Sequence, residues 1–351
     1  MFKCKNNISA FIVLATTIFY SNEISARSNL SIAFQIPLEH HLAENILFFK
    51  QVLEQNSNNS ISVNINDYGT YLKEIREIKE IKEVGSDQKY FMAKDMLEAI
   101  QNRKVEIGML PLTRIVKLVP LADIFNQPFL IDSEKKLADL LKKNSLVRQS
   151  IENSLKELGV VTLWWQTYGN VVFVSKGMSV NTPDNMKNKK VRVFGETLGN
   201  LVLAAGGAPL AIPNSHQYFA YKHKKVDIGM TTIADIRAKK IWEVMDTISL
   251  ANSASMQFII IANDRWWNSL RPDRRRLISE AASTAEMKSV ERLNQIEAES
   301  YREAIENGMS LIVLSNDDKD YWREKSGPIY KKFLEKTGSE GRLGFDSIYY
   351  Y

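Results

Sequence analysis

The chain has 351 residues, of which 44% are hydrophobic and 25% are charged, and its formal net charge at pH 7 is +5. These proportions are those of an ordinary globular protein and exclude a disordered chain, while the length suggests about two domains. Basic and acidic residues are interspersed and no basic stripe alternates with aromatic residues, so nucleic acid is not an expected partner.

The first 26 residues are typical of a secretory signal peptide. A short basic region at Lys3 and Lys5 precedes a mostly apolar run at 8–20, and Ala26 supplies a small residue at the cleavage point. The apolar run is too short to span a bilayer, and a buried first helix is the alternative. We therefore expect a cleaved signal peptide and a periplasmic protein. Because the only cysteine is Cys4, we expect no disulfide and no thiol catalysis in the mature chain.

Short runs typical of β-strands alternate with helical patterns along the next part of the chain. The runs lie at 30–36, 60–65, 105–110 and 160–165, and helical patterns lie between them, notably at 41–54 and 93–102. Such alternation predicts parallel sheets flanked by helices. The charged segment at 69–92 is assigned no function.

The same alternation repeats in the middle of the chain, with β-like runs at 170–175, 189–194, 208–212 and 226–230. Two further runs follow, at 247–251 and 256–263. Pro272 then begins a helical stretch that reaches about Asn307. At 1.5 Å per residue this helix would be about 50 Å long, which exceeds the core of one domain.

We therefore expect an α/β fold of two lobes, with a cleft between them and a long helix that spans both. Lobe 1 is expected to comprise residues 27–166 and about 249–285. Lobe 2 is expected to comprise residues 167–248 and about 286–335, and residues 336–351 are expected to form a C-terminal tail.

Constellations of catalytic residues are scarce in this chain. The four histidines are His40, His41, His216 and His223, and none has a spacing typical of metal ligands. The chain has no GxSxG nucleophile elbow, no P-loop and no GxGxxG dinucleotide-binding motif. The pair His40-His41 is interpreted as a helix cap or a surface feature in preference to a metal site. We therefore expect no enzymatic activity, no metal and no cofactor.

One arginine stands where a buried strand is predicted, in the run KKVRVF. Burying an unpaired guanidinium is costly, so Arg192 needs an acceptor. The carboxylate of a ligand is a suitable acceptor, because the planar guanidinium matches two carboxylate oxygens. The alternative is an internal ion pair with Glu196 or Asp227.

Two further segments supply binding candidates at strand ends, where open α/β sheets hold their ligands. The segment WWQTYGN places Trp165 and Tyr168 where the chain passes between the lobes, and their rings are suited to contact an apolar part of a ligand. Core packing is the alternative for the tryptophans. The segment PNSHQY is typical of a helix start, which Asn214 or Ser215 would cap.

The order of these motifs resembles the signature region of the extracytoplasmic solute receptors of tripartite ATP-independent periplasmic (TRAP) transporters. TPDNMKNKKVRV is followed by LVLAAGGAPLAIPNSHQYFAYKHKKVDIG, which match the family's threonine-proline, lysine-x-arginine strand, glycine-alanine-x-proline turn and valine-aspartate strand. Supporting matches are LEAIQNRKVEIGM, FNQPFLI and LKELGVVTLWW. The resemblance covers nearly all of residues 30 to 330.

The resemblance implies a periplasmic-binding-protein-like fold whose two lobes close on a small organic acid, with the arginine of the lysine-x-arginine strand clamping its carboxylate. That role falls on Arg192. The resemblance also implies contributions to the site from Gln35, His40, Trp165, Tyr168, Asn214, Thr231 and Gln257. It further implies delivery of the ligand to integral membrane subunits of a TRAP transporter. An exported sensor or scavenging module, and an exported enzyme on the same scaffold, are the alternatives.

Two departures from the family pattern bear on the ligand. Val171 stands where many relatives carry a second basic residue, and Thr231 and Thr232 replace an amide or acidic residue. Both changes reduce the polar anchoring of a second carboxylate, and an unpaired buried charge is costly. We therefore expect a preference for monocarboxylates over dicarboxylates.

Overall fold

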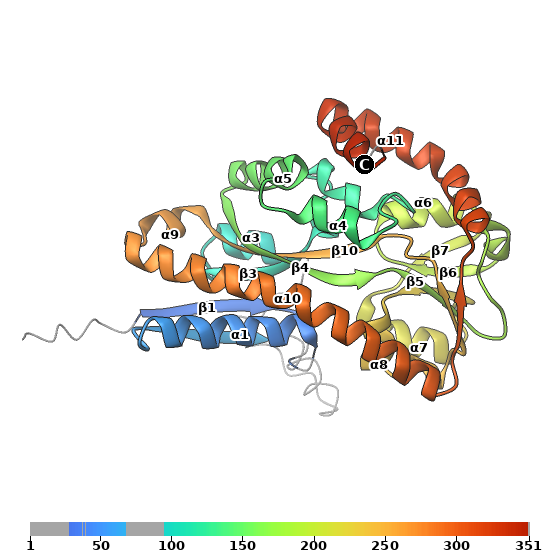
Figure 1. The fold of residues 1–351 in the computed structure, drawn as a ribbon, viewed down its shortest axis with the longest axis horizontal. Helices are drawn as coiled ribbons and strands as arrows, with labels where there is room; N and C mark the ends of the chain where they lie inside the picture. Colours follow the sequence, from blue (N-terminus) through green and yellow to red (C-terminus); the bar gives the residue numbers. More distant parts are fainter. Residues whose placement is uncertain (1–27, 37, 39, 68–94, 350–351) are drawn as a thin grey trace, which may run out of the picture.

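Figure 1 shows the protein as a computed structural model, which describes residues 28–36, 38, 40–67 and 95–349. The expected signal peptide at 1–26 and the charged insertion at 69–92 lie outside the described residues. The described chain forms two sheets, each with helices packed on both faces, and a long helix runs across both (Figure 1). The expected two-lobed α/β architecture is confirmed.

The first sheet, in lobe 1, has five strands in the order β2-β1-β3-β10-β4. They are β1 (Ser28–Phe34), β2 (Ile61–Asp67), β3 (Ile107–Pro111), β4 (Val160–Asn170) and β10 (Ser255–Asn263). β1 runs parallel to β2 and β3, whereas β10 runs antiparallel to β3 and β4. The expectation of parallel sheets is therefore wrong for β10, because this strand enters the sheet from the opposite lobe and so runs in the opposite direction.

The second sheet, in lobe 2, has six strands in the order β11-β9-β5-β8-β6-β7. They are β5 (Val172–Ser175), β6 (Lys190–Val193), β7 (Ala208–Ala211), β8 (Ile228–Thr231), β9 (Thr247–Leu250) and β11 (Ser310–Val313). β6 runs parallel to β7 and β8, whereas β5 is antiparallel to β8 and β9. This sheet is therefore mixed as well, with β5 as the strand that arrives from lobe 1.

The chain passes between the sheets at two adjacent places. β4 leads into β5 through a single residue, Val171, and β9 leads into β10 through residues 251–254. The Val171 N–H donates to the Ala254 carbonyl oxygen at 2.9 Å, and the Ser253 N–H donates to the Val171 carbonyl oxygen at 3.0 Å. The two crossing segments are therefore hydrogen-bonded to each other between the lobes.

Each face of the first sheet is covered by helices. One face packs on α1 (His41–Asn56) and on the first half of α10 (Pro272–Glu306), with α9 (Asp264–Ser269) at its edge. The other face packs on α3 (Met96–Gln101), α4 (Glu134–Leu141), α5 (Leu146–Glu157) and the short turns η1 (Leu112–Arg114) and η2 (Pro120–Asn126). α1 illustrates the cause, because Leu42, Ile46, Phe49 and Leu53 recur every three or four residues and are all buried.

The second sheet is covered in the same way. One face packs on α6 (Glu196–Ala204) and the turn η3 (Pro183–Met186), and the other packs on α7 (Gln217–Lys222), α8 (Ile233–Ala238) and the turn η5 (Ile241–Glu243). The turn η4 (Asn214–His216) precedes α7. Each lobe therefore has two hydrophobic cores, one on each side of its sheet.

Two long helices join the lobes. α10 has 35 residues and packs Ala281 and Ala285 into the core of lobe 1 and Ala304 into the core of lobe 2. α11 (Asn316–Tyr349) bends at Gly338, whose φ of +60° is a conformation that glycine adopts without strain. It contributes to the cores of both lobes, and its last part packs on α5 and η2. Residues 336–349, the described part of the expected C-terminal tail, belong to α11, with its bend at Gly338, and the expected lobe and tail boundaries stay a prediction.

Membrane-spanning helices are not found within the described ranges, because none of the helices there is both long enough and apolar enough to cross a bilayer.

Candidate functional site

Arg192 lies in the middle of lobe 2, on β6 between β7 and β8. Its neighbours Val191 and Val193 are buried in the core that α6 covers, and alternation along the strand places the arginine on the opposite face. The residue is only 2% exposed. A guanidinium is therefore buried inside the lobe, as the strand pattern predicted.

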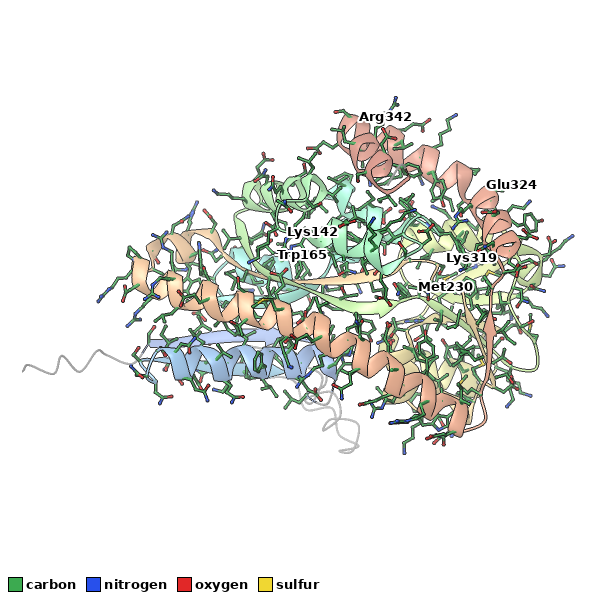
Figure 2. The ribbon with its side chains drawn as sticks, in the orientation of Figure 1. Lys142, Trp165, Met230, Lys319, Glu324 and Arg342 are labelled. Carbon is green, nitrogen blue, oxygen red and sulfur yellow. The ribbon has the colours of Figure 1, made fainter. Side chains whose placement is uncertain are left out.

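Two main-chain carbonyl groups hold the guanidinium of Arg192. Its Nε donates to the Ile212 oxygen at 3.0 Å and its Nη1 donates to the Met230 oxygen at 2.5 Å. Its Cζ lies 5.4 Å from the centroid of the Phe194 ring. Ile212 follows β7 and Met230, labelled in Figure 2, lies on β8. The guanidinium therefore ties together the ends of the two strands that flank its own.

Within the described residues, no carboxylate forms an ion pair with Arg192. Glu196 pairs with Lys332 at 3.1 Å, and Asp227 accepts the main-chain N–H of Lys190 at 2.8 Å. The alternative of an internal ion pair with either acid is therefore wrong. Carbonyl oxygens satisfy two of the donors but carry no full charge, so they leave the positive charge without a counter-charge.

Tyr168 brings lobe 1 into contact with this region. The residue is 4% exposed, and its ring stacks on Phe258 and on His40, with centroid distances of 5.3 and 4.9 Å. The Nδ2 of Asn214 donates to the Tyr168 hydroxyl at 3.0 Å. Because Tyr168 belongs to β4 and Asn214 begins η4, this hydrogen bond joins the two lobes beside Arg192.

Asp235 is the acidic residue of this cluster, and it is 3% exposed. Its Oδ1 accepts a hydrogen bond from Asn214 Nδ2 at 3.3 Å and forms an ion pair with the Nζ of Lys239, the residue that follows α8. Its Oδ2 accepts a long hydrogen bond from the Thr231 hydroxyl at 3.5 Å. The predicted residues Asn214 and Thr231 therefore meet at a carboxylate that the sequence did not reveal.

The protonation states of this cluster follow from its burial and its partners. Burial alone would raise the pKa of Asp235, but attraction to Lys239 and hydrogen bonds from Lys239 and Tyr168 lower it to about 2. Burial lowers the pKa of Lys239, while its pairing with Asp235 acts in the opposite direction. Burial and the charge of Asp235 raise the pKa of Tyr168 well above its usual value. At neutral pH the cluster therefore contains an ionised Asp235 and a neutral Tyr168.

His40 and His41 lie on the lobe 1 side of the cluster, with ring centroids 4.3 Å apart. The Nδ1 of His40 accepts the N–H of Leu42 at 3.2 Å, which confirms that His40 caps α1. Both residues are buried, so the alternative of a surface feature is wrong. Burial lowers the pKa of His40 well below its usual value and lowers the pKa of His41 to about 4. Both rings are therefore neutral at neutral pH.

Several buried polar atoms near the start of α1 lack a hydrogen-bond partner within the described part of the chain. They are the Oε1 of Gln35 and the Nε2 atoms of His40 and His41. Buried polar atoms are normally paired, so such atoms indicate a place where a bound molecule or water completes the bonding. Gln35 and His40 were both predicted to line the site.

Two other predicted residues make internal contacts instead. Trp165 is 2% exposed, donates through Nε1 to Glu152 at 2.8 Å and packs in the core on the α5 side of the sheet (Figure 2). Its position favours the core-packing alternative. Gln257 accepts the Thr167 hydroxyl at 2.9 Å and donates to Ser255 at 2.9 Å, so both ends of its amide are engaged within the sheet.

Sequence reasoning missed Asp235 and Lys239. Thr232 caps the N-terminus of α8, and its hydroxyl accepts the main-chain N–H of Asp235, so the pattern Thr-x-x-Asp has the form of an ordinary helix cap. Lys239 four residues later is likewise the usual partner of a helical acid. The only feature of the sequence that could have indicated them is their position directly after the end of β8. Sheets of this kind bind ligands at the ends of their strands.

Other sites of chemistry are not apparent in the described ranges. No cluster of three or more histidine, cysteine or acidic residues there could hold a metal ion. A cavity of about 840 Å³ lies along α11, but every residue that lines it belongs to this one helix. Its lining mixes charges of both signs around Tyr330 and Phe345 and shares no residue with the cluster around Arg192.

Comparison with protein families gives one match that spans most of the chain. Residues 33–337 match the model of the bacterial extracellular solute-binding proteins, family 7. Among characterised relatives, the C4-dicarboxylate-binding protein DctB of Bacillus subtilis is 20% identical over 302 residues, which are 85% of this chain and 85% of DctB.

Solved structures show the same fold at low sequence identity. DctP7 of Bordetella pertussis, a receptor that binds pyroglutamic acid, superposes with a TM-score of 0.80 at 17% identity, over 92% of this chain and 99% of DctP7. A TRAP periplasmic solute-binding protein of Shewanella oneidensis with bound succinate gives a TM-score of 0.79 at 18% identity, over 92% of this chain and 99% of that protein.

Proposed function

The chain belongs to family 7 of the bacterial extracellular solute-binding proteins, and from this membership we propose that it captures a small organic acid through Arg192 for delivery to a TRAP-type transporter. It is a solute receptor and not an enzyme. The relatives and structural neighbours that share its fold are likewise solute-binding proteins. Its cargo is a carboxylate that enters between the lobes, beside Tyr168 and Asn214.

The observation that carries this proposal is the state of Arg192. Its guanidinium is 2% exposed and held by two carbonyl groups, and it forms no ion pair with any described residue. A buried cation of this kind is costly unless a counter-charge arrives. A carboxylate is the matching counter-charge, because it accepts two hydrogen bonds from one guanidinium.

The relatives support a carboxylate as the cargo. DctB of Bacillus subtilis binds C4-dicarboxylates, the Shewanella receptor holds succinate and DctP7 of Bordetella binds pyroglutamic acid. These ligands differ in size and in charge but each contains a carboxylate. The number of carboxylates therefore has to be argued from the residues of this chain.

The place of action and the partners belong to the same proposal. The family is extracellular by description, and the basic and apolar pattern of the first 26 residues supports export through a cleaved signal peptide into the periplasm. Integral membrane subunits of a TRAP transporter would receive the loaded protein.

Two measurements test the proposal. Mass spectrometry of small molecules released by denaturing protein purified from its own periplasm should identify a carboxylate. Calorimetric titration of that carboxylate should then show that Arg192→Ala weakens binding by about 3–5 kcal/mol, or roughly a hundred- to several-thousand-fold. Arg192→Lys should also bind poorly, because an ammonium cannot form the two parallel hydrogen bonds.

Arg237 provides the matched control, because it lies in the same lobe but is half exposed and pairs with Glu299 and Glu303. Arg237→Ala should leave the affinity unchanged. Full affinity in Arg192→Ala, with a correctly folded protein, would contradict the proposed role of Arg192. A released molecule with no acidic group would contradict the proposed cargo.

A further inference from the structure

Asp235 and Lys239 form a charged pair inside the candidate site that is unlike the helix-surface pairs elsewhere in the chain. Asp235 is 3% exposed, and its oxygens contact Asn214, Thr231 and Lys239. By contrast, both side chains of the pair Asp139–Lys142, at the C-terminal end of α4, are exposed. A salt bridge on the surface adds little to stability, and a buried salt bridge need not stabilise the fold either. The informative fact about this pair is therefore its position in the candidate site.

The pair lies among residues whose pKa values also respond to the charge of Arg192. The charges of Asp235 and Arg192 both act on Tyr168, and the charge of Arg192 also acts on Lys239. Asp235 and Lys239 in turn both act on His40, across the boundary between the lobes. These groups therefore share one electrostatic environment.

The charges of this environment can be counted. Arg192 and Lys239 each contribute one positive charge, and Asp235 contributes one negative charge. Arg292, whose charge also acts on His41, already forms an ion pair with Glu44 at 3.1 Å and so adds no net charge. His40, His41 and Tyr168 are neutral at neutral pH. One positive charge, that of Arg192, remains for a ligand to neutralise, because Lys239 already has its counter-charge in Asp235.

We propose that the Asp235–Lys239 pair restricts this site to ligands with a single carboxylate. The inference rests on the proposed function and specifies its ligand class. A first carboxylate pairs with Arg192. A second one finds no free cation among the described residues of the cluster and approaches the negative charge of Asp235 instead. Like charges brought together in a desolvated site repel each other, so a dicarboxylate is rejected by repulsion as well as by the lack of a partner.

The unpaired atoms of the site fit a neutral ligand body. The Nδ1 of His40 accepts the Leu42 N–H, so the proton of the neutral ring lies on Nε2, which is buried and has no acceptor within the described residues. A neutral N–H donor suits a hydroxyl or carbonyl oxygen of the ligand. A second carboxylate at this place would instead have to be neutralised by a charge that His40 does not carry.

A charge series tests the inference. The proteins are the wild type, Asp235→Asn, and the double variant Asp235→Asn with Lys239→Met. Asparagine keeps the shape and one acceptor oxygen of aspartate, so Asp235→Asn leaves two positive charges in the site, while the double variant returns to one. The exposed pair supplies the control Asp139→Asn, whose partner Lys142 directly follows α4 (Figure 2).

The probes are diacids of three to six carbons, each compared with its own monomethyl ester, which has the same skeleton and one carboxylate. Thermal shift and calorimetric titration measure binding. The wild type and Asp139→Asn should prefer the monoester by roughly tenfold or more. Asp235→Asn should lose or reverse this preference, and the double variant should restore it.

The outcomes separate this inference from the proposed function. A wild type that binds diacids as tightly as their monoesters overturns the single-carboxylate inference but leaves the receptor function intact. An unchanged preference in Asp235→Asn also overturns it, because the preference would then have another origin. If no carboxylate binds the wild type, the proposed function itself fails. Should Asp235→Asn fold poorly, the double variant and Lys239→Met still test the idea, because Lys239→Met alone should weaken binding of every acid.

Discussion

Two adjacent histidines at the start of α1 are buried without being charged. His40 and His41 are 8% and 7% exposed, and burial is the main cause that lowers the pKa of each ring. In the unfolded chain a histidine takes up a proton near its ordinary pKa of 6.5, whereas the folded His41 does so only near 4. Between these pH values the unfolded state binds more protons, so acid shifts the equilibrium toward unfolding.

We therefore predict that the folded protein loses stability as the pH falls from 6.5 to about 4, with His41 responsible for about one proton. As the pH falls through that range, the free energy of unfolding of the wild type should decrease relative to that of His41→Gln, by about 1.4 kcal/mol per pH unit. Urea unfolding at several pH values measures it. Comparing two variants cancels the effects of other titrating groups, and His223→Gln, at an exposed position, is the control. Equal pH dependence in His41→Gln and the wild type would contradict the argument.

Single residues differ in how far the sequence reveals their role. Arg192 could be predicted, because a charged residue between two valines in a strand pattern is conspicuous. Trp165 could not be placed, because an aromatic residue in a strand packs equally well on either face, and here it faces the core. Asp235 was hidden, because its spacing from Thr232 and Lys239 is that of a common helix start, and only its burial distinguishes it.

Among the elements, α11 packs on both lobes, and its residue Trp322 lies where they meet. Trp322 is fully buried, stacks on Phe129 at 5.4 Å and lies 5.5 Å from the ring of Phe173. Its Nε1 donates to the Asn181 carbonyl oxygen at 2.7 Å. Phe129 belongs to the segment after η2 in lobe 1, whereas Phe173 lies on β5 in lobe 2. The indole therefore packs at the place where both lobes meet the helix.

Trp322→Ala should lower the free energy of unfolding by about 3–5 kcal/mol, because it removes a large buried ring and leaves a carbonyl without its donor. Equilibrium unfolding in urea measures this loss. Leu343→Ala is the matched control on the same helix, since Leu343 is 60% exposed, and it should change the stability by less than about 0.5 kcal/mol. A similar small effect of both substitutions would show that α11 does not join the lobes through Trp322.

The positions of the helices and strands in the sequence were predicted better than the directions in which the strands run in the sheets. Strands and helices follow from the periodicity of apolar residues, and the 35-residue α10 begins at Pro272 as the sequence indicates. The antiparallel course of β10 could not be predicted, because an apolar run such as QFIII fits a buried strand in either direction. The last part of α11, beyond its bend at Gly338, could not be predicted, because Gly338, Gly341 and Gly344 interrupt the helical pattern there.

At the scale of the whole molecule, the lobes are joined by the two crossing segments and by α10 and α11. Val171 and residues 253–254 hydrogen-bond to each other between the sheets, and few other residues lie in these connections. Short extended connections absorb a change of backbone angles, whereas the packed lobes move as units. A ligand that pairs with Arg192 in lobe 2 and contacts His40 in lobe 1 would favour the closed arrangement.

We predict that ligand binding reduces the radius of gyration of the protein. Small-angle scattering with and without a saturating carboxylate ligand measures this change. The Arg192→Ala variant serves as the control, because it should keep the radius of the ligand-free wild type at the same ligand concentration. An unchanged radius in the saturated wild type would indicate a rigid receptor in which both lobes keep one arrangement.

The position of β10 within the first sheet has a consequence for the order in which the chain is made and exported. β10 lies between β3 and β4, yet its last residue, Asn263, follows five strands of lobe 2 in the sequence. Until that residue has left the ribosome or the export channel, β3 and β4 each present an unpaired edge. Lobe 1, although it begins first, therefore completes its sheet only after those strands of lobe 2 have emerged. During this interval a holding chaperone would protect the chain from aggregation through these edges.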